Sequence, residues 1–401
     1  MKHPVVRLTP PATRHNFLRH PLSHGLVATV LATAAVIVLG LAGCGGGGGG
    51  NVIRVGEFAS LTGKESAFGQ SSHKGTDLAV QELNAAGGLL GKQIQLLTED
   101  TQSKAGESQT VVNKLVSRDG VVAVLGEVAS GRSLEAAPVC QGAGVPMISP
   151  SSTNPDVTKT GDYIFRVCFI DPFQGTVMAN FASRTLKARK VAVFTDAKSD
   201  YSKGLAKFFK QQHQKNGGEI VVELDFNGGD SDFKSQLTTI KAAEPDAVFI
   251  PAYYTDVALI CMQAKQLGLN VPLFGGDGWE SDKLVEIGKD AVEGHYFSTH
   301  YHPDVSSTKS KAFVAAFQKR YGSAPDAMAA LGYDSMMILA DAVKRAGSVE
   351  GPKLKAALAA TKGFDGVTGM TTIDADRNAS KAAVILQVSN GKFRYLETIN
   401  P

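Results

Sequence analysis

The sequence has little cysteine, little tryptophan and almost no excess of either charge. Its 401 residues include 4 Cys and 1 Trp, and 41 basic residues against 38 acidic ones give a formal net charge of +3. The charges form no basic patch with interleaved aromatic residues, so no nucleic-acid partner is expected. The cysteines show no Cys-x-x-Cys or Cys/His spacing, and we predict no metal site from them.

Motifs of the common enzyme classes are also missing. Nothing resembles a nucleophile elbow or a Walker phosphate loop, and residues 56–63 lack the GxGxxG spacing of a dinucleotide-binding turn. His295, His300 and His302 lie close together, and they suit either a metal or a plain surface or hinge position. We therefore predict no catalytic residue and no cofactor, and we expect a protein that is not an enzyme.

Apolar runs of near-membrane length are confined to the N-terminus. Basic residues without acidic ones precede an apolar stretch over residues 26–41, which is shorter than the roughly 20 residues that span a bilayer. The stretch ends in Leu-Ala-Gly before Cys44, which resembles the lipobox of bacterial lipoproteins. A signal peptide cut at a small residue, or an uncleaved anchor, fits the same pattern. We predict a signal peptide over 1–43, a lipid on Cys44 and a glycine tether up to residue 50.

The rest of the chain alternates β-branched runs with amphipathic stretches, which indicates an α/β fold with parallel sheets. Its length favours two domains, and its 43% hydrophobic content is that of a globular chain able to bury a sizeable core. In a first unit, strands are predicted at 52–56, 93–97, 121–125 and 145–149, with helices at 66–86, 104–118 and 130–142. In a second unit, strands are predicted at 190–195, 219–226, 246–250, 272–274 and 295–299, with helices at 173–187, 201–215, 232–242, 255–267 and 281–288. Helices at 310–321, 326–346 and 351–361 and strands at 368–372, 383–388 and 393–397 follow, and this last part can return to the first unit.

Polar residues gather in the loops that follow these strands, where open parallel sheets bind their ligands. Ser130 opens a helix, whose N-terminus attracts a carboxylate, although a plain helix-capping serine fits equally. Residues 148–155 hold two prolines and several hydroxyls, and by themselves they are simply a turn. Asp277 lies among glycines after another strand, where it suits an ammonium group or an ordinary turn.

From residue 52 to the end, the chain resembles the periplasmic leucine/isoleucine/valine-binding protein family. The segments that carry this resemblance are Leu61-Thr62-Gly63, Asn84-Ala85-Ala86-Gly87-Gly88, Pro146-Met147-Ile148-Ser149-Pro150 with Ser152-Thr153-Asn154-Pro155, Phe165-Arg166, Tyr201-Ser202-Lys203-Gly204 and Gly275-Gly276-Asp277-Gly278. The resemblance implies a type I periplasmic binding fold, with two Rossmann-like lobes joined by a hinge that the chain crosses several times. It implies an N-terminal lobe of residues 51–171 plus 302–380 and a C-terminal lobe of 172–301 plus 381–401.

The family's ligand positions can be carried over one at a time. The resemblance implies that Ser130 holds the ligand carboxylate and that Asp277 holds its ammonium group. The other implied ligand contacts are Ser151 and Thr153 in the first lobe, Tyr201 and Tyr253 in the second, and Phe68 and Trp279 as aromatic walls. Two departures stand out: the positions of a disulfide found in some members are Gln102 and Ala129 here, and Asp277 is shorter than the usual glutamate.

These assignments predict a receptor that captures a small amino acid, branched-chain or otherwise apolar, between two closing lobes. We expect a monomer in the periplasm or at the cell surface, lipid-anchored to a membrane, that delivers its ligand to an ABC permease. An extracellular sensor of amino acids or amides with the same fold is the alternative. Whether Cys140 and Cys168 form a disulfide stays open.

Overall fold

The computed structural model describes residues 52–304 and 307–401. The predicted signal peptide, Cys44 and the glycine tether lie outside the described residues. Two sheets organise the chain, and we refer to each sheet with its covering helices as a lobe. None of the helices in the described part of the chain combines the length and the apolarity that crossing a membrane requires.

The sheet of the first lobe has five strands in the order β2-β1-β3-β4-β5, and all its pairs are parallel. Its strands are β1 (Val52–Ala59), β2 (Gln93–Asp100), β3 (Ala123–Leu125), β4 (Met147–Ser149) and β5 (Ile164–Arg166). The chain segments between these strands form α1 (Ser66–Ala85), α2 (Glu107–Asn113), the π-helical segment η1 (Lys114–Arg118), α3 (Ser130–Ala143) and α4 (Asp156–Lys159). A parallel sheet covered on both faces, as predicted, positions the strand ends that carry the site.

The sheet of the second lobe has seven strands in the order β15-β14-β10-β9-β8-β6-β7, of which β14 and β15 run antiparallel to their neighbours. Its strands are β6 (Lys190–Asp196), β7 (Glu219–Phe226), β8 (Ala247–Phe249), β9 (Leu273–Gly275), β10 (Tyr296–Thr299), β14 (Ala383–Ser389) and β15 (Lys392–Ile399). Its helices are α5 (Asp171–Arg184), α6 (Asp200–Lys215), α7 (Lys234–Ala242), α8 (Tyr254–Gln266) and α9 (Asp282–Gly288), with short turns η2 (Asp277–Trp279) and η3 (Lys289–Ala291). The predicted α/β fold with mainly parallel sheets is confirmed.

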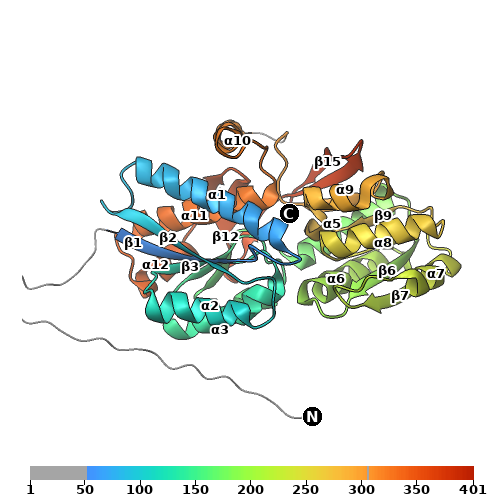
Figure 1. Cartoon of the computed structure of the whole chain (residues 1–401), viewed down its shortest axis with the longest axis horizontal. Coiled ribbons are helices and arrows are strands. Elements are labelled where there is room, and N and C mark those ends of the chain that lie inside the picture. Colours follow the sequence, from blue (N-terminus) through green and yellow to red (C-terminus); the bar gives the residue numbers. More distant parts are fainter. Residues whose placement is uncertain (1–51, 305–306) are drawn as a thin grey trace, which may run out of the picture. The chain divides into compact units, whose positions relative to one another are not determined.

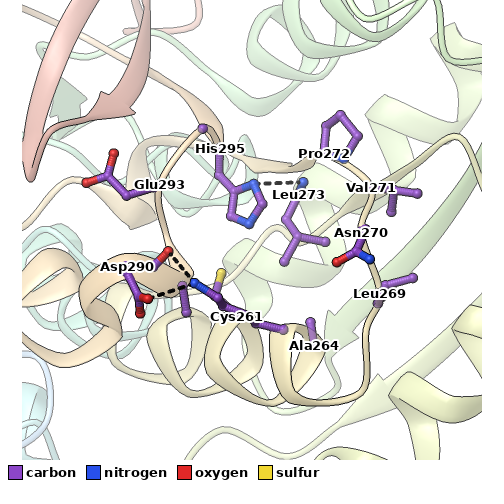
Figure 2. A pocket seen from close by; sticks show the side chains of 13 residues that line it. Cys261, Ala264, Leu269, Asn270, Val271, Pro272, Leu273, Asp290, Glu293 and His295 are labelled. Atoms are coloured by element: carbon purple, nitrogen blue, oxygen red, sulfur yellow. Dashed lines mark hydrogen bonds and ion pairs between the residues drawn. The ribbon is translucent and has the colours of Figure 1, made fainter.

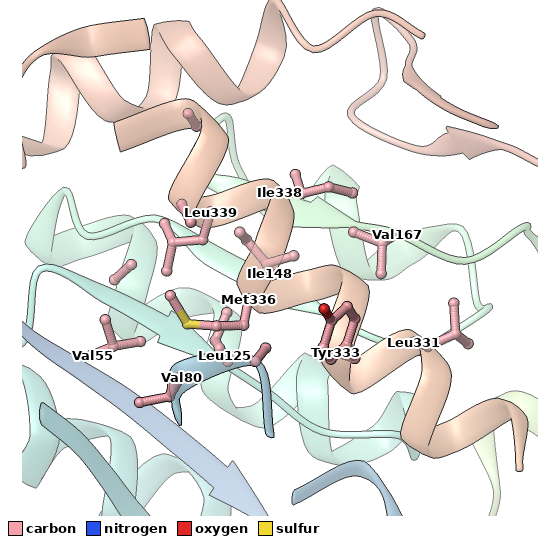
Figure 3. Packing of buried hydrophobic residues seen from close by; sticks show 14 of the residues in the cluster. Val55, Val80, Leu125, Ile148, Val167, Leu331, Tyr333, Met336, Ile338 and Leu339 are labelled. Carbon is pink, nitrogen blue, oxygen red and sulfur yellow. The ribbon is translucent and has the colours of Figure 1, made fainter. Parts of the chain in front are cut away.

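The last helices return to the first lobe. They are α10 (Thr308–Tyr321), α11 (Ala327–Ala346) and α12 (Gly351–Ala359), followed by a small sheet of β11 (Phe364–Gly366), β12 (Gly369–Ile373) and β13 (Ala379–Ser380). In Figure 1, α1 and α11 lie on one side of strands β1 to β3, and α2 and α3 lie on the other. Figure 3 shows α11 laying Met336 and Leu339 over Val55, Leu125 and Ile148 in one buried cluster.

Helices α1 and α11 touch through their backbones. A Cβ atom added to Gly75 of α1 would lie 1.8 Å from the carbonyl oxygen of Ala329, and one added to Gly332 of α11 would lie 2.3 Å from that of Ser72. Neither distance leaves room for a methyl group. The two glycines therefore permit this close packing, which holds α11 against the sheet.

Within the described residues, the chain passes between the two lobes three times. The passages lie between β5 and α5, between β10 and α10, and between β13 and β14. His300 and Lys381 lie on the second and third passages, and both are buried. We propose lobe boundaries of 51–171 plus 302–380 and 172–301 plus 381–401, because they place each sheet in one lobe.

The structure shows that Cys140 and Cys168 do not form a disulfide. Cys140, Cys168 and Cys261 are all buried and free. Burial raises the pKa of the Cys140 thiol to about 12, and a protonated thiol is a poor nucleophile. The three cysteines therefore behave as core residues.

Candidate ligand-binding site

The loops at the carboxyl ends of the parallel strands face each other across the two lobes. From the first lobe come the start of α1 after β1, the start of α3 after β3, and the loop of residues 150–155 after β4. From the second lobe come the start of α6 after β6, the start of α8 after β8, and η2 after β9. This is the strand edge at which open α/β sheets bind their ligands.

A small cavity lies between these loops, and we call it the central cavity. Five of the eight predicted ligand residues line it: Phe68 and Ser151 from the first lobe, and Tyr201, Tyr253 and Asp277 from the second. Val128, Gly278 and Met328 complete its wall. The cavity is therefore polar at Ser151 and Asp277 and mainly apolar elsewhere.

Aromatic rings form much of the apolar wall. The rings of Tyr201 and Tyr253 are stacked with centroids 5.2 Å apart, and Phe68 meets Tyr253 edge-on at 5.6 Å. The Tyr201 hydroxyl accepts a hydrogen bond from the Gly278 backbone N–H at 3.1 Å, which fixes the ring against the loop of Asp277. Rings held in this way present a rigid surface to an apolar side chain.

Asp277 is the acidic group at the polar end, and its two oxygens have different partners. The Gln174 amide donates to one oxygen and His300 Nε2 to the other, each at 2.9 Å. His300 Nε2 also lies 3.3 Å from the hydroxyl of Ser151, and its ring stacks on Phe169 with centroids 3.8 Å apart. His300 therefore links an acid of the second lobe to a hydroxyl of the first, and the carboxylate keeps lone pairs for a further donor.

Ser130 and Thr153 are buried beside the cavity but do not line it. Ser130 is the first residue of α3, where Ala129 is the N-cap, and its hydroxyl accepts from the backbone N–H of Asn154 at 3.2 Å. The plain helix-capping alternative for Ser130 is therefore wrong. The Thr153 hydroxyl makes no hydrogen bond of good geometry among residues 52–304 and 307–401, but it lies close enough to Asp171 to lower the pKa of that carboxyl.

Arg166 explains how the loop after β4 keeps its shape. Its side chain is fully buried, and the guanidinium donates to the backbone carbonyls of Ser152 and Asn154. The hydroxyl of Ser152 in turn bonds the Val128 carbonyl at 3.0 Å. Because the loop is anchored on both sides, Ser151 and Thr153 are held in fixed positions.

The prediction for Trp279 is wrong in position. Its side chain is fully buried in the core of the second lobe, where the indole N–H donates to the Ile250 carbonyl at 2.8 Å and the ring packs near Phe297. Trp279 is two residues beyond Asp277, and the η2 turn directs it away from the cavity. A tryptophan beside a site residue in sequence is here a packing residue.

Two further carboxylic acids are buried near the site. Burial raises the pKa of Glu127 to about 8, and the nearby carboxyl of Glu65 adds to this shift. Burial also raises the pKa of Asp171 to about 8. Neither oxygen of Asp171 has a hydrogen bond of good geometry among the described residues, although the Thr153 hydroxyl lies close to it. The ammonium-binding role nevertheless suits Asp277, because Asp277 lines the cavity and Asp171 does not.

Another hollow, of about 380 Å³, lies on the surface of the second lobe alone. Figure 2 shows it between α8 and the residues around His295 and Asp290. It lies at the opposite ends of strands β9 and β10 from the central cavity. There His295 Nδ1 accepts from the Leu273 backbone N–H, and Lys265 pairs with Asp290 at 2.8 Å. In the part of the chain that the structure describes, no group of three or more His, Cys, Asp or Glu side chains could hold a metal.

Gln174, His300, Val128 and Met328 are site residues that the sequence did not predict. His300 stood out only as one of three neighbouring histidines. Gln174 reaches Asp277 from the first turn of α5, and Met328 reaches the cavity from the start of α11. The sequence carries no sign that these two residues belong to the site, because a buried helix residue fits the same periodic pattern whether it faces the site or the core.

Comparison with known proteins identifies the architecture. The sequence pattern of the periplasmic binding protein family matches residues 52–392. The chain belongs to this family. Among curated relatives of this periplasmic binding protein is the Leu/Ile/Val-binding protein BraC3 of Rhizobium johnstonii, which is 33% identical over 299 residues, 74% of this chain and 80% of BraC3. The leucine-, isoleucine-, valine-, threonine- and alanine-binding protein of Pseudomonas aeruginosa is 29% identical over 81% of this chain and 86% of its own length.

Solved structures agree with this assignment. This periplasmic binding protein is similar to the leucine-binding protein LivK of Thermotoga maritima, with 40% identity and a TM-score of 0.84 over 87% of this chain and 99% of LivK. It is also similar to LivJ of Streptococcus pneumoniae in complex with isoleucine, with 39% identity and a TM-score of 0.83 over 87% of this chain and all of LivJ. The predicted resemblance and the type I periplasmic binding fold are confirmed. Relatives of this kind are binding proteins and not enzymes.

Proposed function

We propose that this protein is the extracytoplasmic substrate-binding lipoprotein of an ABC importer, and that it captures a small apolar amino acid in the central cavity. Leucine, isoleucine and valine fit best, because the cavity wall is mainly aromatic and aliphatic. The observation that carries the proposal is the meeting of Asp277 with Ser151, Phe68, Tyr201 and Tyr253 at one small cavity between the lobes. The ligands named for the relatives support it.

Each end of an amino acid then has a partner. Asp277 accepts from the ammonium group, while Ser130, Thr153 and the loop of Ser151 bind the carboxylate. Each charge-assisted hydrogen bond contributes about 1.5–3 kcal/mol once water is expelled. Because Asp277 belongs to one lobe and the hydroxyls to the other, full binding requires the lobes to close, and the permease can distinguish a loaded receptor from an empty one.

Calorimetric titration with the twenty amino acids tests this function. We expect the branched-chain amino acids to bind most tightly to the wild-type protein. Asp277→Ala should lose about 2–5 kcal/mol of binding free energy, because the ammonium group is then buried without its counter-charge. Asp225→Ala, which removes an exposed carboxylate from the same lobe, is the control and should bind normally. Wild-type affinity in Asp277→Ala would show that the site is elsewhere.

Anchoring to a membrane is a separate part of the proposal. Cys44 follows small residues after an apolar stretch, and the glycine run behind it would let the receptor reach a permease in the same membrane. In cells expressing the full chain, we expect radiolabelled palmitate on the wild-type protein and none on Cys44→Ser. The variant should also leave the membrane fraction. Equal labelling of both proteins would contradict lipidation at Cys44.

A further inference from the structure

A second pocket lies beside the central cavity, and we call it the charged pocket. It has a volume of about 240 Å³, and residues from both lobes line it. Its charged residues are Lys64, Glu65, Arg132, Asp196, Lys198 and Asp200. The lobes are joined on either side of it, because the Asn154 amide donates to the Asp200 carbonyl at 2.8 Å and the Thr255 hydroxyl to the Lys64 carbonyl at 3.1 Å.

The charged pocket adjoins the central cavity at Tyr253. Tyr253 lines both hollows. Phe68 of the central cavity lies one helical turn after Glu65, and Val128 directly precedes Ala129 of the charged pocket. A side chain that starts near Asp277 and runs along Tyr253 therefore points toward Glu65 and Arg132.

Two residues that line the charged pocket each carry a buried polar atom without a partner among the described residues. Glu65 is only 4% exposed, and its Oε2 has no hydrogen-bond partner within residues 52–304 and 307–401. The same holds for the Nε of Arg132, whose Nη2 lies 3.8 Å from Glu65 Oε2. Burial raises the pKa of Glu65 even though Lys64 and Arg132 lie close to it. An orphan acceptor beside an orphan donor matches the N–H and C=O groups of a carboxamide.

The balance of charge also points to an uncharged partner. The pocket's three basic and three acidic side chains cancel in number. Asp196 is further occupied by the backbone N–H groups of Lys198 and Gly228, at 2.9 and 2.8 Å. Among the described residues, all of the pocket's charged side chains except Lys198 already have an ion-pair or hydrogen-bond partner, so a ligand tip with a full charge would gain little in exchange for its lost hydration. A carboxamide loses less and can satisfy both orphan atoms.

We propose that Glu65 and Arg132 form a specificity subsite for the end of the ligand side chain, and that the receptor accepts carboxamide-tipped amino acids such as glutamine beside apolar ones. This inference rests on the proposed function, because the ligand's ammonium and carboxylate must be held at the central cavity. Leucine ends within the aromatic wall, whereas a glutamine side chain carries its amide beyond Tyr253.

Paired titrations with leucine and glutamine test the subsite. Glu65→Leu should weaken glutamine binding by about 10–100-fold, the worth of one hydrogen bond to a charged group, and leave leucine within about threefold. Glu135→Leu is the matched control, because Glu135 also pairs with Arg132, at 3.5 Å, yet lies outside the pocket. In the wild type, glutamate and lysine should bind at least about tenfold more weakly than glutamine.

The outcomes separate the two proposals. Leucine binding without glutamine binding, or equal glutamine affinity in wild type and Glu65→Leu, would overturn the subsite and leave the proposed function intact; the pocket would then be a water-filled mouth. Failure of every amino acid to bind the wild type would overturn both. If thermal melting shows that Glu65→Leu is unfolded, Arg132→Met probes the donor side of the subsite and should show the same selective loss.

Discussion

Asp171 is a carboxylic acid at the start of α5 whose burial has a consequence for stability. Its side chain is fully buried, and burial raises its pKa to about 8, although the nearby Thr153 hydroxyl lowers it in part. Below its ordinary pKa of 3.8, the group is protonated in the folded and unfolded chains alike. As the pH rises from there toward 8, only the unfolded chain readily gives up its proton, so the folded state loses stability.

Replacing Asp171 by asparagine should therefore stabilise the protein most at high pH. We expect Asp171→Asn to raise the free energy of unfolding at pH 8 by about 1–3 kcal/mol, because the neutral amide avoids the buried charge. The gain should shrink as the pH falls toward 4. Thermal melting between pH 4 and pH 8 measures it, at about 2–4 °C per kcal/mol. Asp225→Asn, in an exposed side chain, controls for the lost charge, and a gain independent of pH would contradict the explanation.

Some site residues could be predicted from the sequence and others could not. Ser151, Tyr201, Tyr253 and Asp277 lie in or near the loops after strands, and the carboxyl ends of parallel strands meet at one edge. Chain order therefore places them near one another, and the family resemblance singled them out as ligand contacts. His300 lies on a passage between lobes, where no periodicity fixes its direction. Trp279 shows the converse, since a short helical turn after β9 rotates it into the core.

The close contact between α1 and α11 depends on the small size of Gly75 and Gly332. Gly75 and Gly332 lie in helix interiors, where glycine is otherwise unfavourable by about 1 kcal/mol relative to alanine. Here the added methyl group would meet a backbone carbonyl of the other helix, which cannot move aside as a side chain can. The helices would have to separate, and α11 covers one face of the first sheet.

Gly75→Ala should accordingly destabilise the protein, against the usual effect of alanine in a helix. We expect a loss of about 1–3 kcal/mol in the free energy of unfolding, the usual penalty for overpacking. Urea unfolding followed by circular dichroism measures it. Gly142→Ala is the matched control, because this exposed glycine of α3 has nothing within 4 Å of its added methyl group. It should be neutral or slightly stabilising, and equal effects in the two variants would contradict the close-packing account.

Most elements could be predicted from the sequence because their hydrophobic periodicity agrees with the fold. The long helices α1, α6 and α11 begin and end within a residue or two of their predicted bounds. The strand β5 was missed; it lies at the edge of its sheet, where β4 is its one neighbouring strand. Strands β1 and β2 extend past their predicted ends because the two strands stay paired up to Ala59 and Asp100.

At the scale of the whole molecule, the lobes are held together by a few polar contacts beside the site. The Tyr254 hydroxyl donates to the Lys64 carbonyl at 2.9 Å and accepts from the Ala67 backbone N–H at 3.2 Å. These bonds join the start of α8 in the second lobe to the start of α1 in the first. When ligand binding requires lobe closure, a substitution that destabilises the closed state relative to the open state makes the binding free energy less favourable by the same amount.

Tyr254→Phe removes both hydrogen bonds and keeps the edge-on ring contact with Phe68 at 4.8 Å. We expect about 1 kcal/mol less stability for the closed state, and hence leucine binding about fivefold weaker in calorimetric titration. Tyr296→Phe is the control, because its hydroxyl bonds Gln387 within the sheet of the second lobe and should not affect affinity. Small-angle scattering should show the leucine-free Tyr254→Phe variant to be more open than the wild type. Unchanged leucine affinity with unchanged dimensions would mean that closure does not depend on this contact, and the coupling would then have to reside in the ligand's own bonds to the two lobes.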